Sequence, residues 1–481
     1  MSNRPETSKQ SCPVYKKCGG CQLQNLSYPE QLEFKQRKVE KLLKRFCTVE
    51  KIIGMKTPYH YRNKVQAAFY TDKKGKIISG VYQSGSHHVV GIDSCQTEDV
   101  IADKIIVAVR KLLPSFRMTT YNEDTGKGFL RHILVKRGFA TNQIMLVLVT
   151  GTPVFPSKNN FVKAILKQFP EITTIVQNIN PYRTNLVLGD NQKVLYGKGY
   201  IEDILCGCRF RISPKSFYQI NPVQTEVLYG KAIEFANLKG NETVLDTYCG
   251  IGTIGIIAAK NGAGNVIGAE LNGDAVRDAI VNARANNLKN IRFYKADAGE
   301  FMREAADEDE KPDVVFMDPP RAGSDRKFLD SLIKMSPKKV VYVSCNPETL
   351  ARDLAYLTQN SPYKAQKIQP VDMFPHTAHI ETVVKLVRKT PDAYVDLKVD
   401  MDELDLTASE AKATYEEIKQ YILDKYDTKV SNLYIAQVKE KYGIIERENY
   451  NKPKSANTKQ SQCPAEKAVM IEEAFKHFKM I

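Results

Sequence analysis

The chain has 481 residues, of which 42% are hydrophobic, and a formal net charge of +15. This is the composition of a globular protein with room for two or three domains. No apolar run reaches the length of a membrane span and no apolar segment follows the first residues, so neither a span nor a secretory signal is expected. A cytoplasmic location is the expectation, in which the ten cysteines are thiols, metal ligands or catalysts rather than disulfide partners.

The positive charge is unevenly distributed along the chain. From Thr390 to the end there are 14 Lys and Arg against 17 Asp and Glu, whereas the preceding residues have 56 against 38. A strongly basic surface indicates a polyanionic partner such as a nucleic acid. The surface that binds it should therefore belong to the first 389 residues.

Three cysteines lie close together near the N-terminus, in the run C-P-V-Y-K-K-C-G-G-C that contains Cys12, Cys18 and Cys21. The spacing suits a metal centre, and the two glycines let the backbone fold tightly around it. A fourth thiolate is needed, and Cys95 in G-I-D-S-C-Q-T-E-D is the next candidate. Spacing alone fits a structural zinc site and a [4Fe-4S] cluster equally well.

A basic amphipathic helix is expected over residues 28–46, where apolar residues recur at helical spacing. Its cations fit an ordinary solvated face, with RNA contact as the alternative. From Tyr59 to about Arg211, short β-type runs predict a largely antiparallel domain. The expected strands are 65–70, 88–92, 133–135, 144–150, 174–179 and 186–188, with Arg62, Lys64, Arg131, Lys136 and Arg137 near them.

Beyond residue 241 the pattern changes to strands that alternate with helices. The run N-E-T-V-L-D-T-Y-C-G-I-G predicts a strand that ends in an acid, Asp246, and a Gly-rich turn. Glu270 closes the next strand, where a carboxylate can accept hydrogen bonds from ribose hydroxyls. Asp297 and Asp318 end two later strands. This order predicts a doubly wound parallel sheet with a nucleoside-cofactor site, and the turn lacks the Gly-Lys-Ser/Thr of a triphosphate loop.

The run V-V-Y-V-S-C-N-P-E-T-L at residues 340–350 predicts a buried strand, a sharp turn at Pro347 and a helix. Cys345 would then lie at the strand's carboxyl end, where ligands bind in open α/β sheets. A helix N-terminus lowers the pKa of a thiol, and the thiolate is the nucleophile. A buried, inert cysteine is the simpler interpretation, but this context favours a catalytic one.

Three motifs together resemble the RNA (uracil-5-)-methyltransferase family: D-P-P-R-A-G from Asp318, S-C-N-P around Cys345, and H-I-E-T-V from His379. F-Y-Q-I-N from Phe217 and the C-G-G-C run match it too. The resemblance implies an α/β fold, with S-adenosylmethionine as methyl donor in a Rossmann-like domain that follows a β-rich RNA-binding one. Because the ribosomal RNA branch has a [4Fe-4S] cluster, it favours iron at Cys12, Cys18, Cys21 and Cys95.

The resemblance also implies roles for single residues. Gln219, Tyr248, Glu270 and Asp318 match cofactor-contacting positions, Cys345 the nucleophile and Glu381 the base. The implied reaction methylates carbon 5 of uridine, most closely as in 23S ribosomal RNA, after a thiolate adds to the base. Apolar neighbours of Glu381 predict a raised pKa, which suits a proton acceptor.

Two other functions remain open at this point. One is a transfer RNA (uracil-5-)-methyltransferase. The other is a non-catalytic RNA-binding or iron–sulfur sensor protein on the same fold, which would need neither Cys345 nor Glu381. In every case RNA is the expected partner, with no membrane and no obligate protein partner.

Three domains are expected: 1–210 (cysteine segment and β-rich domain), 211–389 (methyltransferase domain) and 390–481 (a small helical extension). The helix at 28–46 can pack on the methyltransferase domain. In the extension, Asp400–Asp405 is an acidic linker and T-Y-E-E at 414–417 starts a helix. Ser431 opens a second helix, and a third follows Pro464. The negative charge of the extension argues against its docking on nucleic acid.

Overall fold

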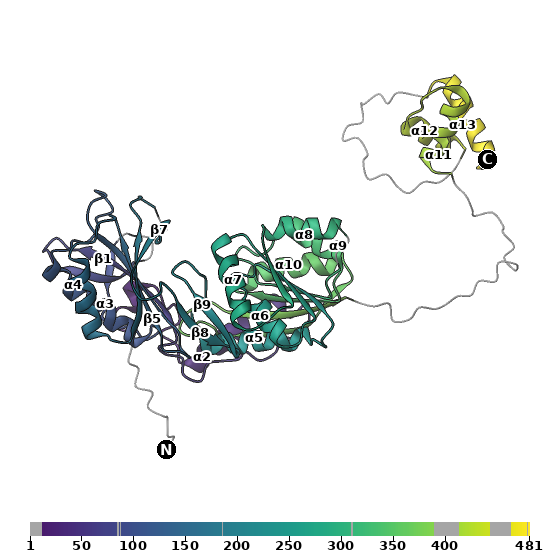
Figure 1. Cartoon of the computed structure of the whole chain (residues 1–481). Helices are drawn as coiled ribbons and strands as arrows, with labels where there is room; N and C mark the ends of the chain where they lie inside the picture. The colour runs from purple at the N-terminus through teal and green to yellow at the C-terminus, as the bar shows by residue number, and fades with distance from the viewer. Residues whose placement is uncertain are drawn as a thin grey trace, which may run out of the picture. The chain divides into compact units, whose positions relative to one another are not determined.

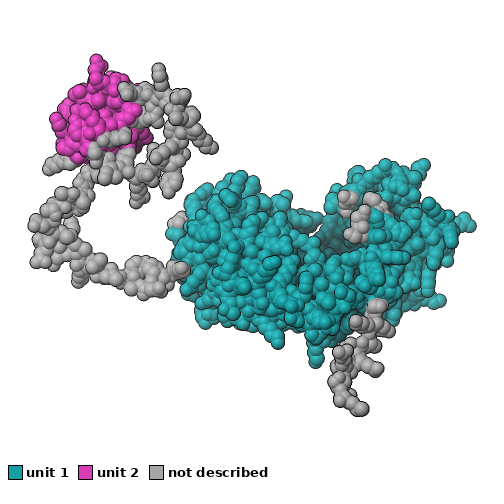
Figure 2. Space-filling view, turned by 180° about the vertical axis from the view of Figure 1, so that it is seen from behind, with its two compact units in different colours: residues 1–392 teal, residues 393–481 magenta. Residues whose placement is uncertain are grey.

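The structure is a computed structural model, and it describes residues 12–388, 413–442 and 463–481 apart from 84, 85, 87, 185, 309, 310 and 479. The chain forms two compact units, residues 1–392 and 393–481 (Figure 2). The first unit contains two seven-stranded sheets and a two-stranded one, and α11, α12 and α13 lie together in the second unit (Figure 1). None of the helices in the described ranges is both long and apolar enough to cross a lipid bilayer.

The first sheet is the β-rich one, and its strands pair in the order β3-β2-β1-β4-β5-β6-β7. Its pairs are antiparallel except β5 with β6, which are joined by a crossover helix and run parallel. The bounds are β1 (Lys64–Thr71), β2 (Ile77–Tyr82), β3 (Val89–Gly91), β4 (Leu130–Arg137), β5 (Ile144–Thr150), β6 (Ile172–Ile179) and β7 (Asn191–Tyr196). The strand expected at 186–188 is absent, and Leu186 is exposed there.

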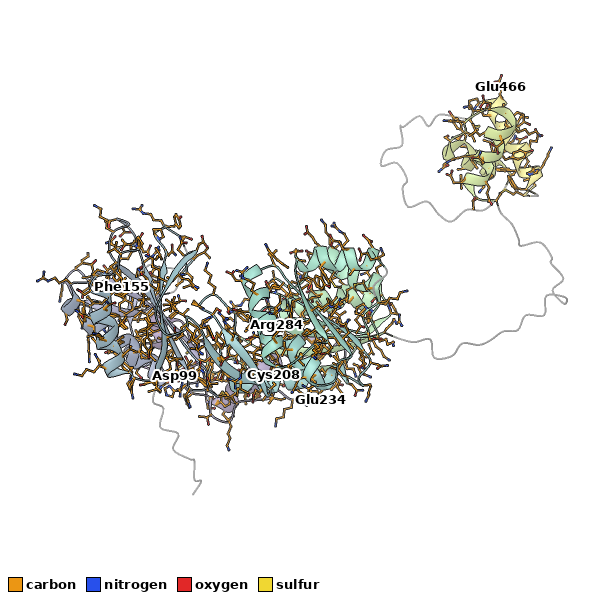
Figure 3. The ribbon with its side chains drawn as sticks, in the orientation of Figure 1. Asp99, Phe155, Cys208, Glu234, Arg284 and Glu466 are labelled. Carbon is orange, nitrogen blue, oxygen red and sulfur yellow. The ribbon has the colours of Figure 1, made fainter. Side chains whose placement is uncertain are left out.

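Both faces of this sheet are covered, which explains why every residue of β5 is buried. Helices α3 (Val100–Leu112) and α4 (Lys158–Gln168), with the short 3-10 helix η1 (Pro114–Phe116), pack on one face. The hairpin of β8 (Ile201–Leu205) and β9 (Cys208–Ile212) packs on the other. Cys208, labelled in Figure 3, belongs to a core cluster that continues into the second sheet, so the two sheets share one hydrophobic core.

The second sheet pairs in the order β12-β11-β10-β13-β14-β16-β15. Strands β10 to β14 run parallel, and β16 enters antiparallel between β14 and β15. This is the predicted doubly wound α/β fold. The bounds are β10 (Thr243–Thr247), β11 (Asn265–Glu270), β12 (Ile291–Lys295), β13 (Val314–Met317), β14 (Lys339–Ser344), β15 (Tyr363–Val371) and β16 (Glu381–Arg388).

Helices cover both faces of the second sheet. One core cluster joins the sheet to α5 (Pro222–Ala236), α6 (Thr253–Lys260) and α7 (Gly273–Ala285). The other cluster joins the opposite face to α8 (Ala298–Asp307), α9 (Arg326–Met335), α10 (Pro347–Asn360) and α2 (Tyr28–Leu43). The alternating strand and helix pattern of the sequence therefore predicts this layer arrangement correctly.

Helix α2 is the basic helix expected near residue 28, and it follows the single-turn helix α1 (Tyr15–Cys18). A capping box of Ser27 and Glu30 starts it, and it packs against α10 and β15. Its buried face includes Gln31 and Lys35 beside Val39 and Leu43. Two polar side chains on a buried face are an unexpected feature and require partners.

The described residues of the second unit, 413–442 and 463–481, form three helices with their own core. Its helices are α11 (Tyr415–Tyr426), α12 (Asn432–Lys441) and α13 (Ala465–His477), which begin where the sequence predicts, α11 with a Thr414–Glu417 capping box. Ile418, Ile422, Ile435, Ile471 and Phe475 are fully buried in it. The predicted acidic linker at 400–405 lies outside the described residues. The three-domain division stays a prediction.

Candidate active site

All six residues predicted to act in catalysis or cofactor contact line one cavity of about 460 Å³. They are Gln219, Tyr248, Glu270, Asp318, Cys345 and Glu381. Four of them end or directly follow parallel strands, namely β10, β11, β13 and β14. Since the carboxyl ends of parallel strands meet at one edge of a sheet, residues about 100 positions apart in sequence converge there.

Glu381 reaches the same edge by a different route. It is the first residue of β16, which pairs antiparallel with β14 in a register that sets Ser344 opposite Thr382. The amino end of β16 therefore lies beside the carboxyl end of β14. This register brings Glu381 next to Cys345, although the two residues belong to strands of opposite direction.

Cys345 lies between the end of β14 and the start of α10, as predicted, with Asn346 as the helix N-cap. Burial, together with the carboxylates of Glu381 and Asp318, raises the pKa of its thiol to about 11, although Arg321 acts in the opposite direction. The predicted lowering of this pKa is therefore wrong for the protein without substrate. Two acidic neighbours and partial burial outweigh the helix N-terminus.

The carboxyl groups of the cavity also favour their protonated forms. Burial, and then Asp318, raises the pKa of Glu381 well above its usual range, which confirms the expected direction. Burial raises the pKa of Asp318 to about 7 and that of Asp246 to about 8. A positively charged group that enters this cavity would favour the ionised forms of these acids, against a single cation, Arg321, in the lining.

The Gly-rich turn after β10 has the geometry of a nucleoside site. Tyr248, Gly250 and Gly252 have φ of 62°, 56° and 81°, so the turn is left-handed at all three positions. Glu270 accepts hydrogen bonds from the backbone N–H of Gly250 at 3.0 Å and of Asn272 at 2.7 Å. A carboxylate so fixed keeps lone pairs for ribose hydroxyls. These residues fit S-adenosylmethionine, whose sulfonium would meet the acidic cavity.

Among the other residues that line the cavity, four have aromatic or charged side chains that were assigned no role from the sequence. Phe217 and Arg321 fall within the motifs that indicated the family, so a signal for them existed. Phe374 and Tyr229 line the cavity without any recognisable local pattern. Phe217 is 63% exposed and also lines a neighbouring cavity of about 450 Å³.

Three of the five basic residues expected near the strands of the first sheet, Arg131, Lys136 and Arg137, bind partners within the protein rather than form a polyanion-binding surface. Arg131 is buried and donates two hydrogen bonds of 3.0 Å to Glu123. Lys136 is buried, donates to the carbonyls of Ser213 and Ser216, and has its pKa lowered to about 7 by burial. Arg137 pairs with Asp99 at 2.6 Å. Exposed cations lie elsewhere in this region, at Lys73, Lys74, Lys127 and Lys193.

The four predicted ligand cysteines come from two segments, residues 12–21 and the loop that contains Cys95, which lie side by side. Burial, together with the nearby thiols of Cys95, Cys18 and Cys12, raises the pKa of Cys21 to about 12, so the four thiols lie near one another. A hydrogen bond of 2.6 Å between Gln24 and Gln96 joins the two segments. Within the described ranges, no three His, Cys, Asp or Glu side chains are spaced to hold a metal ion. The donor set fits a thiolate-ligated centre in its chemistry, although the thiols are not in ligating positions.

Comparison with known proteins agrees with this site. Residues 183–389 match the family described as tRNA (Uracil-5-)-methyltransferase. The chain is 43% identical to an uncharacterized RNA methyltransferase of Bacillus cereus over 80% of this chain and 84% of that protein. It is 46% identical to one of Listeria monocytogenes, over 78% and 83%.

A solved structure extends the likeness to three dimensions. The Pyrococcus abyssi tRNA (uracil-54, C5)-methyltransferase in complex with S-adenosyl-L-homocysteine is 32% identical, with a TM-score of 0.65 over 76% of this chain and 86% of that one. The fold, the cavity at the strand ends and the relatives agree. The chain belongs to the RNA (uracil-5-)-methyltransferase family and has the fold of an S-adenosylmethionine-dependent methyltransferase.

Proposed function

We propose that this protein methylates carbon 5 of uridine in 23S ribosomal RNA, with S-adenosylmethionine as methyl donor. The observation that carries the proposal is the meeting of Cys345 and Glu381 in one cavity beside the nucleoside-binding turn. A non-catalytic RNA-binding protein would have no use for a thiol and a buried carboxyl in that arrangement. The roles given to residues below are part of the same proposal.

Cys345 acts as the nucleophile. Carbon 5 of uracil is a weak nucleophile until a group adds at carbon 6, and addition of the Cys345 thiolate there gives an enolate that can attack a methyl group. S-adenosylmethionine, when bound, supplies that methyl group on a positively charged sulfur. Gln219, Tyr248, Glu270 and Asp318 hold the donor at the strand ends.

Glu381 acts after the methyl group has moved. As a carboxylate it removes the proton from carbon 5, and the electron pair of that C–H bond then expels the Cys345 thiolate from carbon 6. The double bond between carbons 5 and 6 of the uracil forms again, and Cys345 is released for the next cycle. Burial raises the pKa of Glu381, which makes its carboxylate a stronger base than an exposed one.

The target uridine must leave its stack before Cys345 can reach it. Phe217 supports this step, because its exposed ring lies beside the cavity and unstacked bases pack on aromatic side chains. The β-rich region would hold the flanking backbone through its exposed lysines rather than through Arg131, Lys136 or Arg137.

Transfer of labelled methyl from S-adenosylmethionine to RNA fragments tests the proposal. The expected result is label in a 23S ribosomal RNA fragment, mapped to carbon 5 of a uridine. Label in transfer RNA alone would instead support a transfer RNA (uracil-5-)-methyltransferase, which the Pyrococcus abyssi structure favours as the second candidate. Absence of label in both would contradict the assigned reaction.

We also propose that Cys12, Cys18, Cys21 and Cys95 hold a [4Fe-4S] cluster. The support is the gathering of four thiols from two distant segments, together with the sequence resemblance to the ribosomal branch. Such a cluster would tie the two segments together, and the proposed methylation needs no electron from it.

A further inference from the structure

The strand connection that leads into Glu381 is held by residues from the N-terminal part of the chain and by two side chains, Asn221 and Gln224, at the start of α5. Residues 372–380 join β15 to β16, and Phe374 from this connection lines the catalytic cavity. His376 within it has φ of 69°, a left-handed conformation that is unfavourable for a residue other than glycine. Something outside the connection must therefore keep it in this shape.

Helix α2 supplies the central contact through a buried ion pair. Lys35 Nζ lies 2.6 Å from Asp372 Oδ1, and both side chains are completely buried. The same ammonium group donates to the carbonyl of Phe374 at 3.0 Å. Tyr28 donates to the second carboxylate oxygen of Asp372 at 3.0 Å. One helix thus fixes both the start of the connection and the residue that faces the cavity.

Gln31 and Pro58 hold His376, the residue with the left-handed conformation. Gln31 Oε1 accepts from the backbone N–H of His376 at 2.8 Å, and Gln31 Nε2 lies 3.2 Å from His376 Nδ1. The other ring nitrogen lies 2.9 Å from the carbonyl oxygen of Pro58. These contacts assign a neutral ring that donates from Nε2 and accepts at Nδ1. Burial also lowers the pKa of His376, in agreement with a neutral ring.

The residues next to the cysteine segment hold the end of the connection. The backbone N–H of Leu23 donates to the carbonyl of His376 at 2.9 Å. Gln22 Oε1 accepts from the backbone N–H of Ala378 at 3.2 Å. Both residues directly follow Cys21. Contacts therefore run from the cysteine segment to within three residues of Glu381.

We propose that Gln31 and Lys35 of helix α2, with Asp372, are positioning residues that hold the connection between β15 and β16 so that Phe374 and Glu381 face the bound uracil. The inference rests on the role of Glu381 in the proposed function. Desolvating two charges makes a buried ion pair a weak source of stability, so its value here is the fixed location that it gives to the connection. Cys345 is held separately, by β14 and α10.

This separation predicts which chemical step suffers when the pair is removed. Lys35→Met removes the charge and the donor to Phe374, and should slow proton removal by Glu381 while Cys345 still adds to the base. We expect turnover to fall between about 10-fold and about 100-fold, as for a misplaced catalytic group. The fraction of enzyme linked covalently to RNA at steady state should rise, and affinity for S-adenosylhomocysteine should stay unchanged.

Two further variants keep the test decisive. Lys35→Met with Asp372→Asn leaves no unpaired charge, so its melting temperature should recover while turnover stays low and the covalent fraction stays high. Lys41→Met, on an exposed position of the same helix, is the matched control and should behave as the wild type.

Recovery of turnover together with stability in the double variant, or a covalent fraction unchanged by Lys35→Met, would overturn the positioning role. Absence of a covalent complex in the wild type would instead count against the proposed function itself.

Discussion

Cys345 and Cys21 are both partly buried thiols whose pKa lies above its ordinary value, yet their neighbours differ. Around Cys345 the other acids are carboxyl groups, Glu381 and Asp318, each on its own strand end. Around Cys21 they are three more thiols from two segments. A thiol and carboxyl groups in one cavity are acids of different kinds whose titrations are coupled. Four thiols close together are donors of one kind, which suits a shared metal centre. Two thiols of similar burial are therefore expected to have different roles, nucleophile and metal ligand, because their neighbours differ.

The largest effect that would sharpen this contrast comes from Glu381→Gln. Without the base, methyl transfer should still occur once, but the proton on carbon 5 stays and Cys345 remains bound to the RNA. Turnover should fall by about 100-fold or more, and a complex that survives a denaturing gel should accumulate. Glu348→Gln changes an exposed carboxylate at the start of α10 and serves as the control, with turnover within about twofold of the wild type. Normal turnover in Glu381→Gln would contradict its role.

At the other thiol site, Cys18→Ser should change metal content rather than chemistry. Protein purified without oxygen should be brown and contain about four irons per chain, and the variant should lose most of them. The soluble fraction should still bind S-adenosylhomocysteine, because the cavity contains none of these cysteines. Cys463→Ser, which changes a cysteine of the second unit, is the control, and this variant should contain as much iron as the wild type. Stoichiometric zinc in place of iron would refute the cluster assignment.

A smaller effect is expected on the reactivity of Cys345 in the free protein. With a pKa of about 11, its thiolate fraction at pH 8 is about one in a thousand, against about one in ten at the ordinary value. Alkylation by iodoacetamide, followed peptide by peptide by mass spectrometry, should accelerate with pH well beyond pH 9. Glu381→Gln removes a neighbour that raises this pKa, so alkylation at pH 9 should become faster. A rate already level at pH 8 would show that the thiol is activated without substrate.

The smallest effect is expected from removing the second unit. A chain ending at residue 389 keeps β16, which ends at Arg388, and the core of the second unit contains only residues from 413 onward. Turnover and S-adenosylhomocysteine binding should stay close to those of the full chain. Loss of S-adenosylhomocysteine binding in a folded truncated chain would mean that the second unit contributes to the catalytic fold.

The residues that sequence could predict are those placed by local rules. Glu270, Asp318 and Cys345 could be assigned because each ends or follows an apolar run, and parallel strands bring such ends together. The position of Glu381 depends on an antiparallel register with β14, which no local pattern reveals, and only family resemblance identified it.

Burial and long-range pairing account for what sequence could not predict. Lys35 looked like one more cation of a solvated helix, but its partner Asp372 lies 337 positions away. The same limit applies to Arg131 and Lys136, whose partners are set by the packing of the first sheet. The pKa of Cys345 was predicted in the wrong direction because it is raised by burial and by carboxyl neighbours from other strands, neither of which a local pattern reveals.

The central claim is that Cys345 forms a bond to the uracil ring, and RNA with 5-fluorouridine at the target position tests it directly. Fluorine replaces the proton that Glu381 removes, so the reaction should stop after methyl transfer with the enzyme attached to the RNA. The wild type incubated with S-adenosylmethionine should give a complex stable on a denaturing gel, with its crosslink mapped to Cys345, and Cys345→Ala should give none. No complex with the wild type, or an equal amount with Cys345→Ala, would contradict covalent catalysis.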